Sequence, residues 1–425
     1  MPHSPSRRRA ILFVQALLGA VLMIDHPIGA GSVPLQAAEP GAAAAAGWVW
    51  FGTYTGAAPL GSGLYAARFD PTTGTLSPAA LAATLKNPSF LALHPRLPVL
   101  YAVSEVTDGE GRAAGAVVAF TIDPATGLLT QLNQQSSGGS GPCHLSVDPT
   151  GRVLLVANYG SGSVLCLGIA ADGSLQAAVE ASGPRPGGMI QHVLDQPQSP
   201  GIDPQRQAAP HAHSIDVSAD GRFAVACDLG CDRVFIHALD VDRATLQPHR
   251  SAPLTAGAGP RHFAFHPQQN FAYCINELDL TVTAFAFDPQ AGSLLPLDSV
   301  PTLPAAVVDR RGISTAEIAI HPSGKFLYGS NRGHNSVAIY SINSGTGRLS
   351  LQGVEPIRVS TPRHFAIDPS GCFFLAAGQT SGSVAVFAID QETGTLAFTG
   401  HTLAVPAPVC ILFARTAAGT ADAGR

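Results

Sequence analysis

The sequence predicts an all-β fold, a seven-bladed β-propeller with four-stranded antiparallel blades. Three observations support this prediction. A unit of short apolar strands recurs along the chain, and within each unit apolar and polar residues alternate with a period of two. After the N-terminal segment, no stretch sustains the 3.6-residue period of an amphipathic helix. The 45 glycines and 34 prolines are spread along the chain, as in a turn-rich globular protein.

The first 46 residues have the order of an export signal. Arg7, Arg8 and Arg9 precede an apolar run at 10–24, and a stretch of small residues follows. The apolar run is short for a membrane-spanning helix. We expect residues 1–46 to be an export signal and linker, so that the folded part is periplasmic or secreted. An uncleaved N-terminal anchor is the alternative, and the cleavage site and export route stay open.

Residues 47–415 contain the repeat and are expected to form one propeller domain. The aligned copies lie at 47–56 with 63–76, 87–106, 141–164, 211–234, 259–282, 314–337 and 361–384. Each complete unit has an apolar strand, an Asp/His-Pro-x-Gly turn, a second apolar strand, a polar loop, and a third strand followed by TG-x-L. We expect 405–415 to join 47–54 in one blade and close the ring. Residues 416–425 are expected to be a flexible tail.

The spacing of the repeat is broken by an insertion at about 180–210, rich in Pro, Gly and Gln. A connection of this length inside a compact domain is often functional. The insertion ends in "RQAAPHAH", so it brings Arg206, His211 and His213 to the start of the next strand.

Charge and cysteine usage exclude some functions. The net charge of −5 predicts no affinity for nucleic acid. Seven cysteines are an odd number, and most stand singly inside apolar strand patterns, which favours buried thiols over a disulfide framework. Cys227 and Cys231 are the only close pair, and their disulfide state stays open.

Polar residues recur at fixed distances from the turn glycine or its counterpart. Eight residues before it stand Ser89, Cys143, His213, Arg261, Ala316 and Arg363. One residue further on stand Phe90, His144, Ser214, His262, Glu317 and His364. Eight residues after the turn stand Glu105, Tyr159, Leu229, Glu277, Arg332 and Gln379. The two strands are antiparallel, so the first and third sets meet at the end of the blade away from the turn. The repeat does not require charge there, so we expect a site at this rim of the channel.

These units and motifs resemble the seven-bladed propeller lactonases of the 6-phosphogluconolactonase type, which are related to fungal carboxymuconate cyclases. The resemblance covers about residues 47–415. It implies a lactonase of carbohydrate and glucose metabolism with no cofactor. In the cyclase relatives the site is one His, one Arg, one Glu and a second Arg, which by motif fall on His213 in "PHAH", Arg261 in "GPRH", Glu277 in "NEL" and Arg332 in "NRGH". The export signal departs from this picture, because a phosphorylated sugar lactone is a cytoplasmic metabolite.

Hydrolysis of a lactone requires a base that activates water and cationic donors for the developing oxyanion. His213 suits the base because imidazole titrates near neutral pH. Arg261 and Arg332 suit an anion, because a guanidinium grips a carboxylate or phosphate through two hydrogen bonds. Glu277 either orients one of these groups or is itself the base, and the sequence does not separate these roles.

Four further residues are expected to bind substrate: His211, Arg206, Glu317 and His262. For Glu317, a structural ion pair is an equal alternative. His144 and His364 are interpreted as structural. We expect no metal, because "HAH" has no further ligand at suitable spacing, and no nucleophilic serine, because the G-x-S-x-G elbow is missing.

The expected function is therefore hydrolysis of the ring ester of a sugar or anionic lactone, with a small-molecule lactone as the partner. The alternatives are a non-catalytic propeller that binds a ligand or protein on its rim, and a muconate-type cycloisomerase. We expect a monomer that makes no stable membrane contact after signal cleavage.

Overall fold

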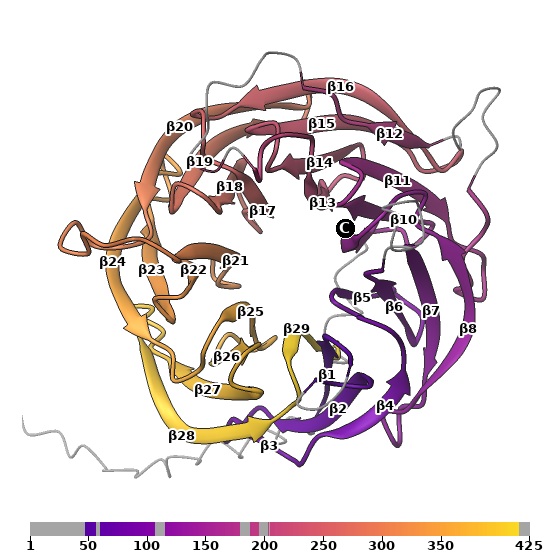
Figure 1. Ribbon diagram of the computed structural model, residues 1–425, viewed down its shortest axis with the longest axis horizontal. Coiled ribbons are helices and arrows are strands. Elements are labelled where there is room, and N and C mark those ends of the chain that lie inside the picture. The colour runs from indigo at the N-terminus through magenta and orange to yellow at the C-terminus, as the bar shows by residue number, and fades with distance from the viewer. Residues whose placement is uncertain are drawn as a thin grey trace, which may run out of the picture. The chain divides into compact units, whose positions relative to one another are not determined.

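The computed structural model describes residues 47–56, 60–106, 115–178, 188–194, 203 and 205–415. These belong to the second of two compact units, Ala44–Arg425. The expected export signal and C-terminal tail lie outside the described residues. Within the described ranges there are 29 strands in seven sheets and no α-helix. The sheets form a ring around a central channel, which confirms the predicted seven-bladed propeller (Figure 1).

The first blade contains both ends of the described chain. Its strands are β29 (Pro408–Phe413), β1 (Gly47–Thr53), β2 (Gly63–Asp70), and β3 (Thr75–Leu76) and β4 (Ala80–Thr84), which both pair with β2. The register pairs Phe51 of β1 with Ile411 of β29. The strand at 405–415 thus closes the ring by hydrogen bonding to the N-terminal strand, as the repeat predicts.

The other six blades follow in chain order. The second has β5 (Leu91–Leu93), β6 (Val99–Ser104), β7 (Ala116–Ile122) and β8 (Leu129–Ser136). The third has β9 (Pro142–Val147), β10 (Val153–Asn158), β11 (Ser163–Gly168) and β12 (Met189–Gln191). The fourth has β13 (Ala212–Val217), β14 (Phe223–Asp228), β15 (Arg233–Asp240) and β16 (Thr245–Pro253).

The fifth has β17 (Pro260–Phe265), β18 (Phe271–Asn276), β19 (Thr281–Asp288) and β20 (Ser293–Pro301). The sixth has β21 (Ser314–Ile320), β22 (Phe326–Arg332), β23 (Ser336–Ile342) and β24 (Leu349–Pro356). The seventh has β25 (Pro362–Ile367), β26 (Phe373–Gly378), β27 (Ser383–Ile389) and β28 (Leu396–Ala404).

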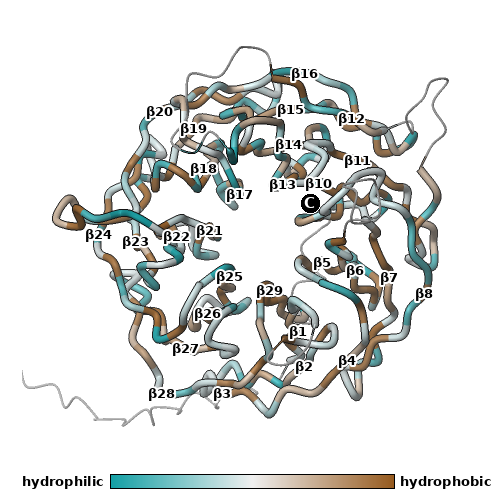
Figure 2. The backbone as a smooth tube through the Cα atoms, viewed as in Figure 1, coloured by the Kyte–Doolittle hydropathy of each residue, from teal (hydrophilic) through white to brown (hydrophobic). Residues whose placement is uncertain are grey.

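Burial changes from the middle of each blade to its outer edge. All six residues of β10, VLLVAN, are buried, as expected for a strand covered on both faces. The outermost strand β16, TLQPHRSAP, is mostly exposed and carries proline and charge, which protect a sheet edge from pairing with another chain. Figure 2 shows hydrophilic residues along the outer strands β16 and β24.

The apolar core consists of seven clusters of described residues, each between two neighbouring blades. For example, Val99 and Tyr101 of the second blade pack with Leu145 and Leu154 of the third. No blade can bury both faces alone, so the closed ring is the cooperative unit.

The His-Pro turns join neighbouring blades at the face away from the predicted site. The Nε2 atom of His94 lies 3.0 Å from the carbonyl oxygen of Gly151 in the next blade. The same contact joins His266 to Gly324 at 3.0 Å and His321 to Gly371 at 2.8 Å. The histidine of this turn therefore links one blade to the next.

The insertion at 180–210 differs from the expected loop. It contains β12, which pairs with β11 and completes the third blade. The broken spacing hid a regular fourth strand, because β12 is only three residues long.

Across all the described ranges, no helix is long and apolar enough to cross a bilayer.

Candidate active site

The inner strands begin with an irregularity that sets the site. In four blades the register shifts so that one residue of the inner strand has no paired partner: Cys143, His213, Arg261 and Arg363. Each is the residue eight positions before the turn. A β-bulge of this kind bends the strand and re-aims a side chain, and such bulges are common next to active sites. In three of these blades the bulged residue, Cys143, His213 or Arg363, lines a cavity at the channel mouth.

A cavity of about 280 Å³ lies at this mouth. It is lined by Glu105, Cys143, Tyr159, Arg206, His213, Glu277, Arg332 and Arg363. All but Arg206 come from the two register positions that the repeat places at this end of the blades, and Arg206 comes from the insertion. The sequence had indicated Arg206, His213, Glu277 and Arg332 as site residues. The other four stood in the same register but were not selected.

Glu277 is the centre of a cluster of guanidiniums. Its Oε1 lies 2.8 Å from Nη2 of Arg206 and 3.1 Å from Nη2 of Arg332. Its Oε2 accepts a hydrogen bond of 3.0 Å from Nε of Arg261. Burial alone would raise the pKa of Glu277, but Arg332, Arg261 and Arg206 outweigh it and lower the pKa to about 2. Glu277 is therefore an ionised carboxylate at neutral pH and a poor general base.

Arg261 is more deeply buried than a rim position implies. It is 1% exposed, does not line the cavity, and donates from Nη1 to the carbonyl oxygen of Ala316 at 2.6 Å. Burial, followed by the charges of Arg332 and Arg363, lowers its pKa to about 10. Arg261, which was expected to bind the anion of the substrate, thus does not reach the surface of the cavity. It holds Glu277 from behind.

His213 lines the same cavity as a neutral imidazole. It is 4% exposed, and its Nδ1 lies 3.8 Å from Sγ of Cys143. Burial, followed by the charges of Arg261, His262 and Arg363, holds its pKa well below the usual 6.5. A neutral imidazole can accept a proton at physiological pH, so His213 meets the first requirement for a base.

Tyr159 supports the cavity wall from the third blade. Its hydroxyl oxygen accepts hydrogen bonds from Nε and Nη2 of Arg206 at 3.0 and 2.9 Å. Burial raises the pKa of Tyr159, so the phenol stays protonated. The hydroxyl donates to no described residue, so its hydrogen is available to a ligand. His211 does not line the cavity. It stacks on Tyr159 at a centroid distance of 4.5 Å.

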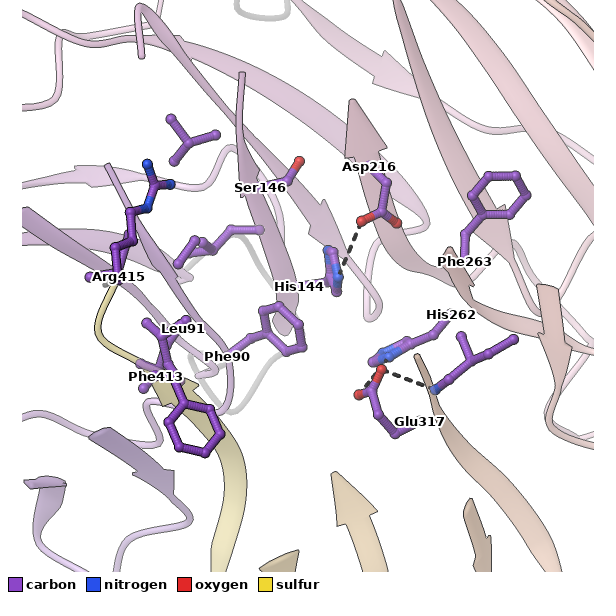
Figure 3. Close-up of a pocket in the computed structure, with 16 residues that line it drawn as sticks. Phe90, Leu91, His144, Ser146, Asp216, His262, Phe263, Glu317, Phe413 and Arg415 are labelled. Atoms are coloured by element: carbon purple, nitrogen blue, oxygen red, sulfur yellow. Dashed lines mark hydrogen bonds and ion pairs between the residues drawn. The ribbon is translucent and has the colours of Figure 1, made fainter. Parts of the chain in front are cut away.

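The remaining predicted residues, His262 and Glu317, lie one layer deeper in the channel. They line a second cavity of about 440 Å³ on the side of the turns, shown in Figure 3. Oε2 of Glu317 is 3.0 Å from Nδ1 of His262 and 3.3 Å from Nε2 of His364. The ring of Phe90 packs against that of His144 in a tilted arrangement, with a centroid distance of 4.1 Å. These side chains form a layer beneath the His213 cavity and do not line it.

The ranges that the structure describes contain no group of three or more His, Cys, Asp or Glu side chains placed to hold a metal ion. The side chains that line the cavity at the channel mouth supply one neutral imidazole, one phenol, one thiol, two carboxylates and three guanidiniums.

Comparison with known proteins identifies the family. The model of "Lactonase, 7-bladed beta-propeller" matches residues 48–413. The 6-phosphogluconolactonase of Bacillus subtilis is 36% identical over 368 residues, 86% of this chain and 97% of that protein. The 6-phosphogluconolactonase of Formosa agariphila is 33% identical and covers 75% of this chain and 85% of its own. The solved structure of the periplasmic gluconolactonase of Pseudomonas aeruginosa is similar with a TM-score of 0.76 and 29% identity, covering 87% of this chain and 99% of that one. The chain belongs to the seven-bladed β-propeller lactonase family.

Proposed function

We propose that this protein hydrolyses the ring ester of a sugar or anionic lactone, in the manner of a 6-phosphogluconolactonase. The observation that supports this most strongly is a neutral, buried His213 in one cavity with guanidiniums ordered around ionised Glu277. Ester hydrolysis requires a proton acceptor for water and fixed positive charge for the oxyanion. The family and its 6-phosphogluconolactonase relatives support the same reaction class.

In the proposed reaction, His213 removes a proton from a water molecule as the water oxygen bonds to the lactone carbonyl carbon. Negative charge develops on the carbonyl oxygen, where Arg332, Arg206 and the hydroxyl of Tyr159 can donate hydrogen bonds. The bond between that carbon and the ring oxygen then breaks. Protonated His213 returns the proton to the ring oxygen, which leaves as a hydroxyl group, so the product is a hydroxy acid.

Glu277 has a positioning role in this proposal. Its two oxygens engage guanidiniums from the insertion, the fifth blade and the sixth blade. Because the carboxylate is ionised, it fixes the direction of these cations before substrate binds. Preorganised charge of this kind contributes to catalysis without reorganisation during the reaction.

The test is a panel of lactones, 6-phosphogluconolactone, gluconolactone and muconolactone among them, with the spontaneous rate subtracted. We expect wild type to accelerate hydrolysis of at least one, with no effect of a chelator, and His213→Ala to lose at least about tenfold in kcat/KM. The matched control is His401→Ala, which removes an exposed imidazole on the outer strand β28. If no lactone is turned over, or if His213→Ala equals wild type, a rim-binding propeller replaces the enzyme. Isomerisation of muconolactone without hydrolysis would point to the cycloisomerase.

We further propose that the protein acts outside the cytoplasm as a monomer whose partner is a small-molecule lactone. Support comes from Arg7–Arg9 followed by an apolar run, and from a similar structure described as periplasmic. We expect no binding to nucleic acid and no stable membrane contact after cleavage. N-terminal sequencing of protein from its native host should find a start between 29 and 47, and a full-length cytoplasmic product would refute export.

A further inference from the structure

The cavity at the channel mouth has two halves, contributed by different runs of blades. Consecutive blades three to six supply Tyr159, His213, Glu277 and Arg332, which hold the proposed chemistry. The seventh and second blades supply Arg363 and Glu105. No step in the proposed hydrolysis uses this second half.

Among the arginines that line the cavity, Arg363 is the one without an ion pair in the described ranges. Arg206 and Arg332 each hold Glu277. The Arg363 side chain has no hydrogen bond or ion pair with any residue in the described ranges. Its nearest aromatic contact is Tyr54 of the first blade, whose ring centroid is 5.4 Å from the guanidinium carbon. No protein acceptor in the described ranges therefore competes with a ligand for its N–H groups.

Glu105 lies in the same half and forms no ion pair with Arg363. Its two carboxylate oxygens accept from the hydroxyl of Tyr54 at 3.3 and 3.2 Å. Glu105 and Tyr159 also border an adjoining cavity of about 360 Å³, which Lys86 lines as well. The second half of the site therefore leads into further space, where a substituent on the lactone can extend.

The charge balance favours an anion. Three guanidiniums line the cavity, those of Arg206, Arg332 and Arg363, and Arg261 adds a fourth through its contact with Glu277. The carboxylates of Glu277 and Glu105 balance two of them, which leaves an excess of two positive charges. The chain as a whole has a net charge of −5. A positive site in a negative protein concentrates anionic ligands locally.

From these contacts we infer that Arg363 binds an anionic substituent of the substrate, a phosphate or a carboxylate distant from the ring ester. This inference rests on the proposed lactonase function and makes Arg363 a specificity-determining residue. A guanidinium suits both groups, because its paired N–H bonds match two oxygens of either one.

The test measures binding of open-chain acids and does not depend on turnover. Gluconate, 6-phosphogluconate and glucarate differ only at C6, which carries a hydroxyl, a phosphate or a carboxylate. Calorimetric titration of the full-length protein should show at least one charged acid binding about tenfold more tightly than gluconate. Tighter binding of 6-phosphogluconate would identify phosphate as the group recognised, and tighter binding of glucarate would identify carboxylate.

Substitution of Arg363 assigns the effect. Arg363→Gln should remove the preference for the charged acid while leaving gluconate affinity within about twofold, and Arg363→Lys should keep part of it because the charge remains. Retained gluconate binding shows that the variant is folded. Arg348→Gln, at a surface ion pair between the turn before β24 and Asp298 of β20, is the matched control and should change nothing.

Three results would overturn the inference: equal affinity of wild type for all three acids, an unchanged preference in Arg363→Gln, or an equal loss for gluconate and its charged analogues. These are distinct from failure of the lactonase proposal, which shows as absence of lactone turnover. If lactones are hydrolysed but no acid shows a preference that depends on Arg363, the lactonase proposal stands and the anion-subsite proposal is wrong.

Discussion

Nε2 of His213 lies 4.0 Å from Oε2 of Glu277, while Nε of Arg261 holds that same oxygen at 3.0 Å. The carboxylate is thus engaged by guanidiniums and is beyond hydrogen-bond distance of the imidazole. Glu277 therefore does not orient His213 as the acid of a catalytic triad does. The base and the carboxylate are neighbours with separate roles, and variants of each should behave differently.

The pH dependence should follow His213. A base must be neutral, and the pKa of His213 is held well below 6.5 by burial and then by Arg261, His262 and Arg363. We expect kcat/KM to stay constant as the pH falls through 6.5 and to decrease only in more acidic solution.

The same profile has an internal check. Arg363→Gln removes one of the charges that disfavour protonated His213, so the acidic limb should move to higher pH. Arg348→Gln should leave it in place, since that side chain is exposed in the turn before β24. If the acidic limb of the kcat/KM profile does not move in Arg363→Gln, the limb does not report the protonation of His213.

Arg261→Ala and Arg332→Ala should separate stability from catalysis. Arg261 is 1% exposed and bonds both Glu277 and the Ala316 carbonyl. Its loss leaves buried acceptors unpaired, and we expect the free energy of unfolding to fall by about 2 kcal/mol or more. Arg332, whose side chain is 15% exposed, should affect stability less and reduce kcat/KM by about tenfold or more.

Urea unfolding and kinetics of both variants test this, with Arg348→Ala as the surface control. Equal stability of the two variants would show that the burial of Arg261 carries no energetic weight.

His237 gives a prediction outside the site. It is 2% exposed, its Nδ1 has no partner within the described residues, and burial and then His192 lower its pKa to about 3. Below pH 6.5 the unfolded histidine binds a proton that the folded one cannot, so stability is lost as the pH falls. His237→Phe removes this linkage. Between pH 7.5 and 5.5 the variant should gain about 1.4 kcal/mol relative to wild type.

Equilibrium unfolding in urea at the two pH values measures that difference, and His237→Gln should reproduce it because it also removes the imidazole. A difference that does not change with pH would mean that His237 protonates in the folded state.

The thiols should differ sharply in reactivity. None of the seven cysteines forms a disulfide, and only Cys372 is exposed, which departs from the expectation of burial. Burial raises the pKa of Cys143 and of Cys166 to about 12. Native protein should react with one equivalent of a thiol reagent quickly, and with seven after denaturation. Cys372→Ser should abolish the fast phase, and fast reaction of more than one thiol would contradict the buried positions.

The register of the repeat predicted the blades and the end of the channel at which side chains meet. Alternation and turn spacing are local, so they survive in each copy and place Cys143, His213, Arg261 and Arg363 at one level. Alternation and turn spacing do not indicate which of these four side chains lines the cavity. Whether an arginine points into the cavity or behind it depends on the bulge and on the next blade, as the bond from Arg261 to the Ala316 carbonyl shows.

Side-chain contacts between neighbouring blades also could not be predicted from the repeat, because it describes each blade separately. His262 and Glu317 look like site residues in the register, but they bind each other across two blades in a deeper layer. Cys227 was compared with Cys231, yet its sulfur lies 3.4 Å from that of Cys274 in the next blade. Arg206 lines the same cavity as His213, because its insertion leads directly into β13.

The pairing of β1 with β29 imposes an order on how this protein can be made. The first blade lacks its inner strand until β29 has been synthesised, so β1 must wait for a strand that follows all the other described strands. During that interval, the open edge of β1 and the apolar faces of the two neighbouring blades are exposed to other chains. A truncation that removes only β29 should therefore yield an aggregating product, and not a slightly shorter propeller.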